Sequence, residues 1–293
     1  MAYFQHDNMR MYYEDVGRGE PIIANHGLSE NTCYWNDTGV TAKLAERYRF
    51  IPYDMRGHGQ TIIEGEPYGY DADTMAADID ALADHLGLDK FHLLAHATGG
   101  MVTARYAMTR SERLLSLLLT DTGSATQPVM PGMENMTQEE IEQAREAARQ
   151  AAQQAPPIET LTPEERKTRW RENPGPFTFS IVGRPDEDKL WQIMDGFFRR
   201  HLSFQALAEF RSSFYTDPDP RVEGLRNIKC PTLILLGEHD IVFIKPSEIM
   251  AQEIPDNKHI ILPGIGHMTA VEDPDRTIKE LLDFLDSVPQ KGK

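Results

Sequence analysis

Short apolar runs, each bounded by turn residues, recur along the first 120 residues of the chain. Their length and their content of Ile, Leu, Val and Phe are typical of buried strands, and we expect strands at 21–27, 49–57, 91–97 and 114–123. Residues 1–17 alternate in polarity like a pair of strands. Amphipathic helical patterns fill the intervals at 41–48 and 73–87. Strands that alternate with helices predict a mostly parallel sheet covered on both faces.

The helix expected over residues 73–87 shows how the pattern sets its limits. Met75, Ile79, Leu82 and Leu86 recur at helical spacing and predict one buried stripe. Asp73 or Thr74 is the expected N-cap, and Gly87 is the expected stop.

The pattern changes near residue 124. Helical stretches follow at 136–154, 163–172, 186–200 and 203–215 with almost no strand signal, and strands resume at 230–240 and 258–267 before a last helix at 275–288. We therefore predict an α/β fold with a doubly wound, mostly parallel sheet. Its core comprises residues 1–123 and 214–293, and a helical cap is inserted over residues 124–213.

Composition narrows the function. The formal net charge is −16, whereas proteins that bind nucleic acid or anionic membranes present a basic face, so neither partner is expected. Cys33 and Cys230 stand far apart in no CxxC pattern, so neither a disulfide framework nor a zinc site is expected. The sequence also implies no other metal and no organic cofactor. No apolar run approaches the roughly 20 residues that span a bilayer, and no signal segment is evident, so a cytoplasmic protein is predicted.

The stretch LLAHATGGM, residues 93–101, predicts a strand that turns tightly into a helix. Small residues at Ala95, Gly99 and Gly100 allow the helix to approach the strand closely. This arrangement resembles the nucleophile elbow of the α/β-hydrolase family, and the resemblance covers nearly the whole chain. Ala97 stands where the family carries its nucleophile, and a methyl group can attack nothing.

Further motifs agree with the resemblance. Asn25-His26-Gly27, followed by Leu28, resembles the family's oxyanion loop, which implies that the backbone N–H groups of Leu28 and Thr98 face a developing oxyanion. The stretch DMRGHG at 54–59 is a frequent family signature with a mainly structural role.

The resemblance also implies an acid and a base. Asp240 follows the strand at 230–240 and His267 follows the strand at 258–267, so their order after the elbow is the order expected for this fold. Glu238 is a rival for the acid, and Asp121, which follows an earlier strand, is held in reserve.

Other side chains near these motifs are candidates for substrate contact. His26 and His96 are expected to be satisfied near the backbone rather than to carry protons, and Ser29 and Thr98 bear hydroxyl groups away from the elbow tip. The cap adds bulky aromatic side chains, from which we expect Trp170, Phe177 and Trp191 to border a pocket between core and cap.

Three interpretations of Ala97 remain open. The chain is a serine hydrolase of a bulky carboxylic ester or lactone, inactivated by alanine at position 97; or it is an enzyme that needs no nucleophile and uses His267 with Asp240 as a general base; or it is a ligand-binding protein on the same fold. The first is the main prediction. Aromatic residues in the cap and an acidic balance favour a bulky, cationic lactone of the macrolide type as substrate.

Overall fold

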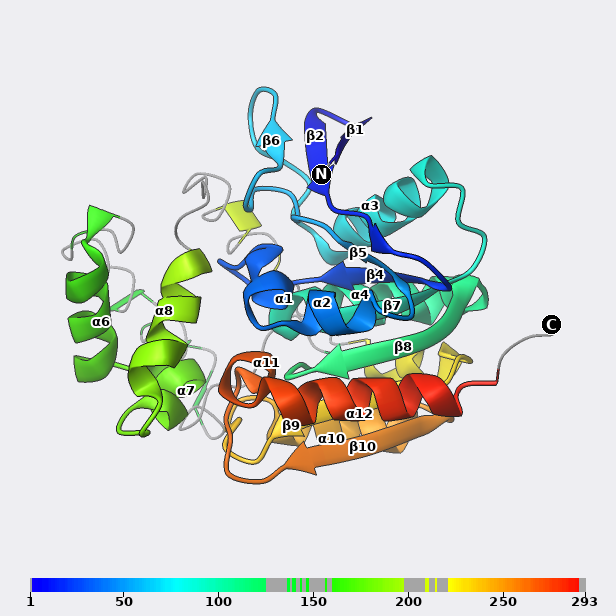
Figure 1. Cartoon of the computed structure of the whole chain (residues 1–293). Coiled ribbons are helices and arrows are strands. Elements are labelled where there is room, and N and C mark those ends of the chain that lie inside the picture. The colour runs from blue at the N-terminus through cyan, green and yellow to red at the C-terminus, as the bar shows by residue number, and fades with distance from the viewer. Residues whose placement is uncertain are drawn as a thin grey trace.

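A computed structural model describes residues 2–124, 136–137, 139–140, 143, 146–147, 156, 160–197, 209–210, 214 and 221–289. The fold is built on a seven-stranded sheet with the strand order β10-β9-β8-β7-β4-β5-β3 (Figure 1). All neighbours in this sheet run parallel except β3 and β5, which confirms the predicted α/β class. The strands are β3 (Val16–Gly17), β4 (Pro21–Asn25), β5 (Arg49–Pro52), β7 (Phe91–His96), β8 (Leu114–Thr120), β9 (Thr232–Gly237) and β10 (Asn257–Leu262).

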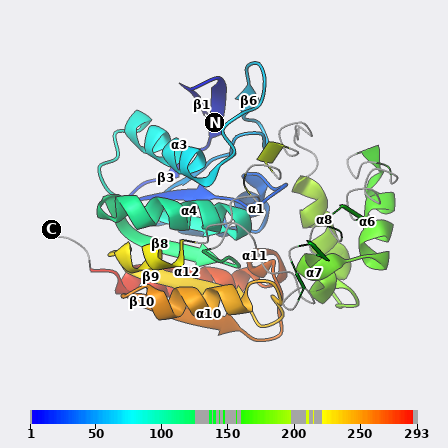
Figure 2. The same cartoon turned by 180° about the vertical axis from the view of Figure 1, so that it is seen from behind.

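The central strands are apolar along their whole length because both faces of the sheet are covered. All six residues of β7 are buried, and consecutive side chains enter different cores: Leu93 packs on one face and Leu94 on the other. Helices α3 (Ala72–His85), α4 (Ala97–Arg110) and α10 (Ile244–Glu253) cover the first face, which is nearer the viewer in Figure 2. Helices α1 (Cys33–Asp37), α2 (Val40–Leu44) and α12 (Pro274–Ser287) cover the other.

Helix α3 buries Met75, Ile79 and Leu82 as the sequence predicts. Its N-cap was predicted wrongly, because the side chain of Asp71 accepts the hydrogen bond from the backbone N–H of Thr74 at 2.8 Å. Asp71 is preferred because its backbone is extended, as an N-cap requires, whereas the residues after it are already helical. Gly87 follows the helix with φ of 66°, which confirms it as the stop.

The N-terminal strand pair forms a second, smaller sheet. β1 (Ala2–His6) and β2 (Met9–Tyr13) pair antiparallel, as expected, and β6 (Ile62–Ile63) adds to β2. Short 3₁₀ turns η1 (Ser111–Arg113) and η4 (Val222–Asn227) complete the core elements.

A helical insert, which we define as residues 160–197, lies between β8 and η4 in the chain. It contains α6 (Pro163–Glu172), α7 (Gly175–Thr178), η3 (Phe179–Ile181) and α8 (Glu187–Phe197). Figure 1 shows it at the end of the sheet toward which β8 and β10 point, where α8 packs on α1 and α11 (Thr269–Glu272). The helices predicted at 163–172 and 186–200 correspond to α6 and α8, whereas those at 136–154 and 203–215 fall largely outside the described residues. The division into a core and a cap over 124–213 therefore stays a prediction.

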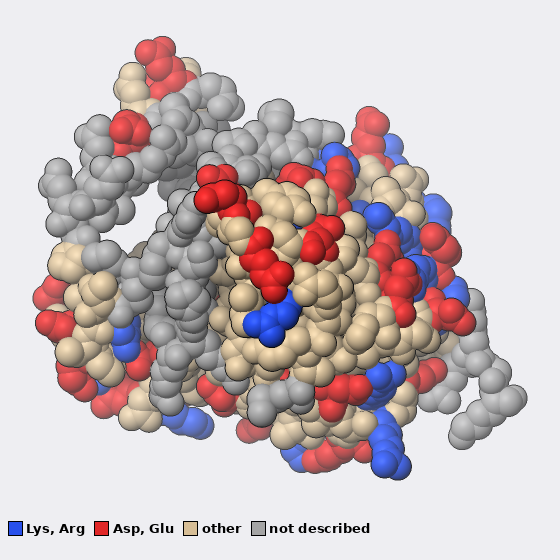
Figure 3. Space-filling view, turned by 90° about the horizontal axis from the view of Figure 1, so that it is seen from above, with Lys and Arg blue, Asp and Glu red and all other residues tan. Residues whose placement is uncertain are grey.

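Figure 3 shows one face of the molecule, on which Asp and Glu side chains are interspersed with Lys and Arg side chains. The described residues of this face form no continuous basic patch, in keeping with the net charge of −16. None of the helices that the structure describes has both the length and the apolar character needed to cross a membrane.

Candidate active site

The elbow between β7 and α4 holds Ala97 in the left-handed region, with φ of 47°. Such a conformation costs a non-glycine residue on the order of 1 kcal/mol, so the surroundings must impose it. They do so by close packing: a Cβ atom on Gly99 would overlap the carbonyl oxygen of His26, and one on Gly100 would overlap Thr122. The Oγ1 of Thr122 also donates a 2.5 Å hydrogen bond to the carbonyl oxygen of Ala97. Two of the small residues that the sequence singled out, Gly99 and Gly100, are therefore required by these close contacts.

The predicted acid and base meet at the carboxyl ends of the parallel strands. The Nδ1 of His267 lies 2.9 Å from the Oδ2 of Asp240, and both side chains are buried. The other carboxylate oxygen of Asp240 accepts the backbone N–H of Phe243 at 3.2 Å. A proton assigned to Nδ1 by this contact leaves Nε2 of His267 to accept a proton from a reacting group.

His267, the predicted base, lies beside the elbow. The ring of His267 is 5.1 Å from the ring of His96, centroid to centroid, and His96 is the residue that precedes Ala97. The sequence places His96 and His267 at the ends of different predicted strands, and the parallel sheet brings the carboxyl ends of those strands together.

Asp121, the reserve acid, also lies in this cluster, but it holds backbone rather than the base. Its Oδ2 accepts the hydroxyl of Thr269 at 2.6 Å, and its Oδ1 accepts the backbone N–H of Gly237 at 3.3 Å. Burial raises the pKa of Asp121 above its usual range, against the opposing effect of the neighbouring His96. Asp240, and not Asp121, has the hydrogen bond to His267 among the described residues.

His96 lies between two carboxylates. Its Nδ1 is 3.3 Å from the Oδ2 of Asp121, and its Nε2 is 3.3 Å from the Oε1 of Glu30. Tyr34 stacks on the imidazole ring with centroids 4.2 Å apart. Burial lowers the pKa of His96, but Glu30 and Asp121 outweigh burial and raise it to about 9. The imidazole is therefore charged at neutral pH. The sequence predicted that His96 is satisfied near the backbone, whereas its partners here are the side chains of Glu30, Asp121 and Tyr34.

Glu30 was not found from the sequence. It accepts the backbone N–H of Gly27 at 2.6 Å and so fixes the loop that carries Leu28. A Cβ atom on Gly27 would lie 3.0 Å from the Cβ of Ala97, which shows that this loop touches the elbow. Nothing in the polarity pattern distinguishes a buried loop carboxylate from a solvated one, so the sequence carried no signal for it.

The two predicted oxyanion donors flank this contact. Thr98 is buried in the first turn of α4, where backbone N–H groups have no intrahelical acceptor. Leu28 is half-buried, and Ser29 beside it is half-buried with φ of 64°. The role of the Leu28 and Thr98 N–H groups and a substrate contact for Ser29 stay predictions.

His26 supports the loops instead of carrying protons. Its Nδ1 lies 2.8 Å from the carbonyl oxygen of Gly27, and its Nε2 accepts the backbone N–H of Met55 at 3.1 Å. Burial, followed by the nearby His58, lowers the pKa of His26 well below its usual value, so the ring is neutral. His26 thus joins the loop at 25–28 to the DMRGHG stretch at 54–59.

The three aromatic residues predicted to border the pocket occupy different surroundings. The ring of Phe177 lies 4.6 Å from the ring of His267. Trp170 stacks on Trp191 with centroids 4.8 Å apart, and the Nε1 of Trp191 donates to Glu187 at 2.8 Å. The tryptophan pair thus joins α6 to α8. Of the three aromatic residues, Phe177 is the one that contacts the ring of His267 among the described residues.

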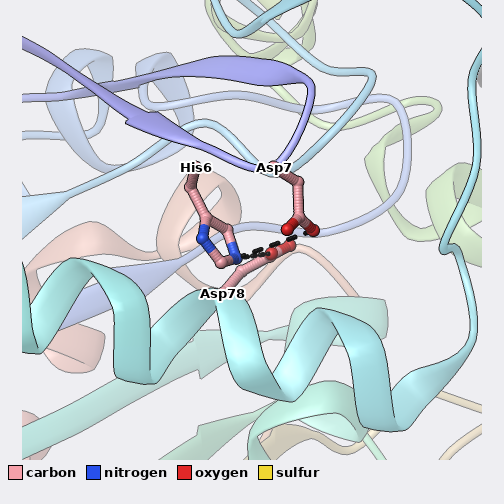
Figure 4. A group of neighbouring side chains, drawn as sticks. All are labelled: His6, Asp7 and Asp78. Atoms are coloured by element: carbon pink, nitrogen blue, oxygen red, sulfur yellow. Dashed lines mark ion pairs between the residues drawn. The ribbon is translucent and has the colours of Figure 1, made fainter.

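One group outside this site has the composition of a metal site. His6, Asp7 and Asp78 converge between the N-terminal hairpin and α3 (Figure 4), with the Nε2 of His6 3.2 Å from the Oδ1 of Asp78. Asp78 is already engaged by the fully buried Arg56, which donates to its two oxygens at 2.8 and 2.5 Å. The guanidinium supplies the positive charge that a cation would bring, so the cluster is an ion-pair network.

Comparison with known proteins agrees with this geometry. The sequence profile of the alpha/beta hydrolase fold family matches residues 20–274. The chain belongs to this family. A non-heme haloperoxidase from Rhodococcus erythropolis is 27% identical over 288 residues, which cover 96% of this chain and 97% of the relative.

Other members of the family with similar sequence or structure have different names. A putative 2-succinyl-6-hydroxy-2,4-cyclohexadiene-1-carboxylate synthase from Bacillus subtilis is 26% identical over 96% of this chain and 97% of its own length. The solved esterase from Exiguobacterium antarcticum superposes with a TM-score of 0.76 at 24% identity, over 98% of this chain and 99% of that one. The match over residues 20–274 establishes the family, the solved structure shows the same fold, and the named activities of these similar proteins differ.

Proposed function

We propose that this α/β-hydrolase binds a carboxylic ester or lactone and carries every part of a hydrolytic site except the nucleophile. The observation that carries the proposal is the buried pair of His267 and Asp240, 2.9 Å apart, beside an elbow that still holds position 97 in the left-handed conformation. An oriented base and a shaped elbow serve acyl transfer, in which a hydroxyl at the elbow attacks a carbonyl carbon.

The mechanism assigns one task to each part. With serine at position 97, His267 would take the hydroxyl proton during attack and return it to the leaving alcohol, while Asp240 stabilises the imidazolium. The backbone N–H groups of Leu28 and Thr98 would stabilise the oxyanion of the tetrahedral intermediate. With Ala97 no acyl-enzyme forms, so this chain binds and orients its ester but turns it over only at a residual rate.

The substrate we propose is bulky and largely apolar. Phe177 places an aromatic ring 4.6 Å from the ring of His267, where an acyl or alcohol group would lie. The acidic composition, with a net charge of −16, supports a substrate that also carries a cation, such as an amino-sugar macrolide lactone. Because Cys33 and Cys230 stand far apart in the sequence and predict no disulfide framework, we propose a reducing, cytoplasmic setting.

The test compares this chain with Ala97→Ser and with the control Ala97→Gly, on a panel of aryl, alkyl and macrocyclic esters and lactones. We expect Ala97→Ser to hydrolyse at least one of them about 10³-fold faster than the other two forms, with a burst from the acyl-enzyme. A fluorophosphonate probe should label only the serine form. Equal rates in all three forms, or no labelling of Ala97→Ser, would exclude the nucleophilic mechanism.

A second candidate is a nucleophile-free enzyme in which His267 deprotonates water or the substrate directly. The intact pair of His267 and Asp240 in a chain with Ala97 favours it, as does the name of the Bacillus subtilis relative, a synthase rather than a hydrolase. In that case this chain is active as it stands, and His267→Ala abolishes the activity. If neither this chain nor its Ala97→Ser variant turns over any ester while a lactone raises the melting temperature, the site is a receptor site.

A further inference from the structure

Glu272 holds the backbone on both sides of the base. Its side chain is fully buried, and its carboxylate accepts the N–H of Gly266 at 3.0 Å and the N–H of Met268 at 3.3 Å. The N–H of Glu272 in turn donates to the carbonyl oxygen of Met268 at 2.8 Å, which closes the turn into α11. The loop that carries His267 is therefore wrapped around one carboxylate.

The same carboxylate is reached from the helical insert. The hydroxyl of Ser180 donates to the Oε1 of Glu272 at 3.0 Å. Nη1 of Arg184 lies 3.5 Å from its Oε2, and Nη2 of Arg184 donates to the backbone carbonyl of Glu272 at 3.0 Å. A buried carboxylate needs such partners, because an uncompensated charge is strongly unfavourable away from water. The insert thus supplies part of the stabilisation on which the base loop depends.

Two further contacts place the insert directly on the base loop. A Cβ atom on Gly266 would overlap the side chain of Ser180, so this side chain packs directly on the backbone of Gly266. The ring of Phe177, a few residues before Ser180, lies 4.6 Å from the ring of His267. One short piece of the insert therefore contacts both the base and the carboxylate that holds it.

We propose that Glu272 is a positioning residue that transmits the placement of the helical insert to His267. The inference rests on the proposed function only in taking His267 as the base. While the insert is docked, Ser180 and Arg184 complete the surroundings of Glu272, and the loop holds the imidazole against Asp240. If the insert moves away, the carboxylate loses both partners and the loop is released, so the base is in place only under a docked insert.

The kinetic test uses Ser180→Ala and Arg184→Gln, alone and combined with Glu272→Gln, in the Ala97→Ser background. We expect each change in the insert to lower kcat about tenfold and Glu272→Gln to lower it about a hundredfold, with KM nearly unchanged, because a small misplacement of a catalytic group slows the reaction sharply. The effects should not add, since all three residues act through one carboxylate. Arg184→Lys should restore part of the rate.

The matched control is Arg171→Gln. Arg171 pairs with Glu187 inside the same insert and has no contact with the base loop among the described residues. We expect this variant to lose an ion pair without changing kcat. An equal loss in Arg171→Gln and Arg184→Gln, or strictly additive effects of Arg184→Gln and Glu272→Gln, would overturn the proposal, since both results indicate a general weakening of the fold.

A second readout does not depend on hydrolysis. In this chain as it stands, proton NMR should show a downfield resonance of the His267 Nδ1 proton that is bound to Asp240. We expect Arg184→Gln and Glu272→Gln to shift or broaden this resonance and Arg171→Gln to leave it unchanged. An unchanged resonance in Glu272→Gln would refute the proposal. If Ala97→Ser is inactive on every ester while the resonance responds as expected, the proposed reaction fails and the positioning role of Glu272 stands.

Discussion

The elbow around Ala97 and the loop around His267 meet at one edge of the sheet, but they are built differently. The elbow is shaped by packing of small residues, because Gly99 and Gly100 leave no room for a Cβ atom and residue 97 is held with φ of 47°. The base loop is shaped by charge, with carboxylates that hold the imidazole and the flanking N–H groups. A substitution at position 97 can therefore remove the nucleophile of the elbow and leave its shape unchanged. Substitution of a carboxylate in the loop around His267 would change both the shape of that loop and the charge beside the imidazole.

The largest expected effect separates the two acids near the base. In the Ala97→Ser background, Asp240→Asn should lower kcat about 10⁴-fold, because an amide stabilises the wrong tautomer of the imidazole and no longer supports its charge. Asp121→Asn should lower kcat far less, about tenfold, since Asp121 holds Gly237 and Thr269 rather than His267. Steady-state kinetics on both variants measures this difference. A larger loss in Asp121→Asn would make Asp121 the acid of the triad.

Next in size is a change in the packing of the elbow. Gly99→Ala should lower the free energy of unfolding by about 2–3 kcal/mol, because the new Cβ atom overlaps the backbone of His26, which cannot move aside. The matched control is Gly196→Ala in α8, where the nearest atom is a side-chain oxygen of Asp37 at 3.0 Å. Urea unfolding should show little change in the control. Similar losses at both glycines would mean that the elbow is not tightly packed.

The charged histidine in the elbow predicts a dependence of stability on pH. An imidazole in the unfolded chain has a pKa near 6.5. In the folded protein burial lowers the pKa of His96, but the carboxylates of Glu30 and Asp121 outweigh burial and raise it to about 9. A group whose folded pKa is raised stabilises the protein fully below its unfolded pKa and loses that contribution as the pH passes its folded pKa. The free energy of unfolding should therefore fall between about pH 6.5 and 9, by about 3 kcal/mol, since each unit of pKa difference corresponds to about 1.4 kcal/mol.

The control for this effect is His96→Gln, in which the decline should be absent. Burial also raises the pKa of Asp121, so this carboxyl group causes a separate decline of the free energy of unfolding at lower pH. The His96→Gln variant keeps this second decline, because it keeps Asp121. Urea unfolding at several pH values measures both curves. Parallel curves for the two proteins would show that His96 is uncharged in the folded state.

The smallest expected effect concerns the strain at position 97. Ala97→Gly relieves a left-handed conformation but increases the freedom of the unfolded chain, and each contribution is on the order of 1 kcal/mol with opposite sign. The free energy of unfolding should change by less than about 0.5 kcal/mol. Ala104→Gly in the middle of α4 has no strain to relieve and should cost about 1 kcal/mol or more. Equal losses in the two variants would show that the elbow stores no strain.

The sequence predicted what depends on neighbours in the chain. Apolar runs located the central strands, and the spacing of Met75, Ile79 and Leu82 located α3, because these patterns reflect which face of an element is buried. Asp240 and His267 were predicted from their places after strands and from the family resemblance, and the structure brings them to 2.9 Å. Even the wrongly predicted N-cap, Asp73 or Thr74, lay only two or three residues from the correct one, Asp71.

The missed residues depend on contacts that chain order does not reveal. Glu30 and Glu272 look like ordinary acidic residues of loops and helix ends, and only folding shows that both are buried. Ser180 reaches Glu272 across 92 positions of the chain, and no periodic pattern encodes such a pairing. Supporting carboxylates of this kind are therefore visible in the structure alone.

The left-handed elbow has a consequence for protein engineering. Because packing of Gly99, Gly100 and Thr122, and not the side chain at 97, fixes the backbone there, the position acts as a fixed mount. A cysteine, a selenocysteine or a synthetic nucleophile introduced at 97 would be presented on the same mount beside the imidazole of His267. This chain thus offers a scaffold in which the residue at 97 can be exchanged while the proposed base His267 and its partner Asp240 are left unchanged.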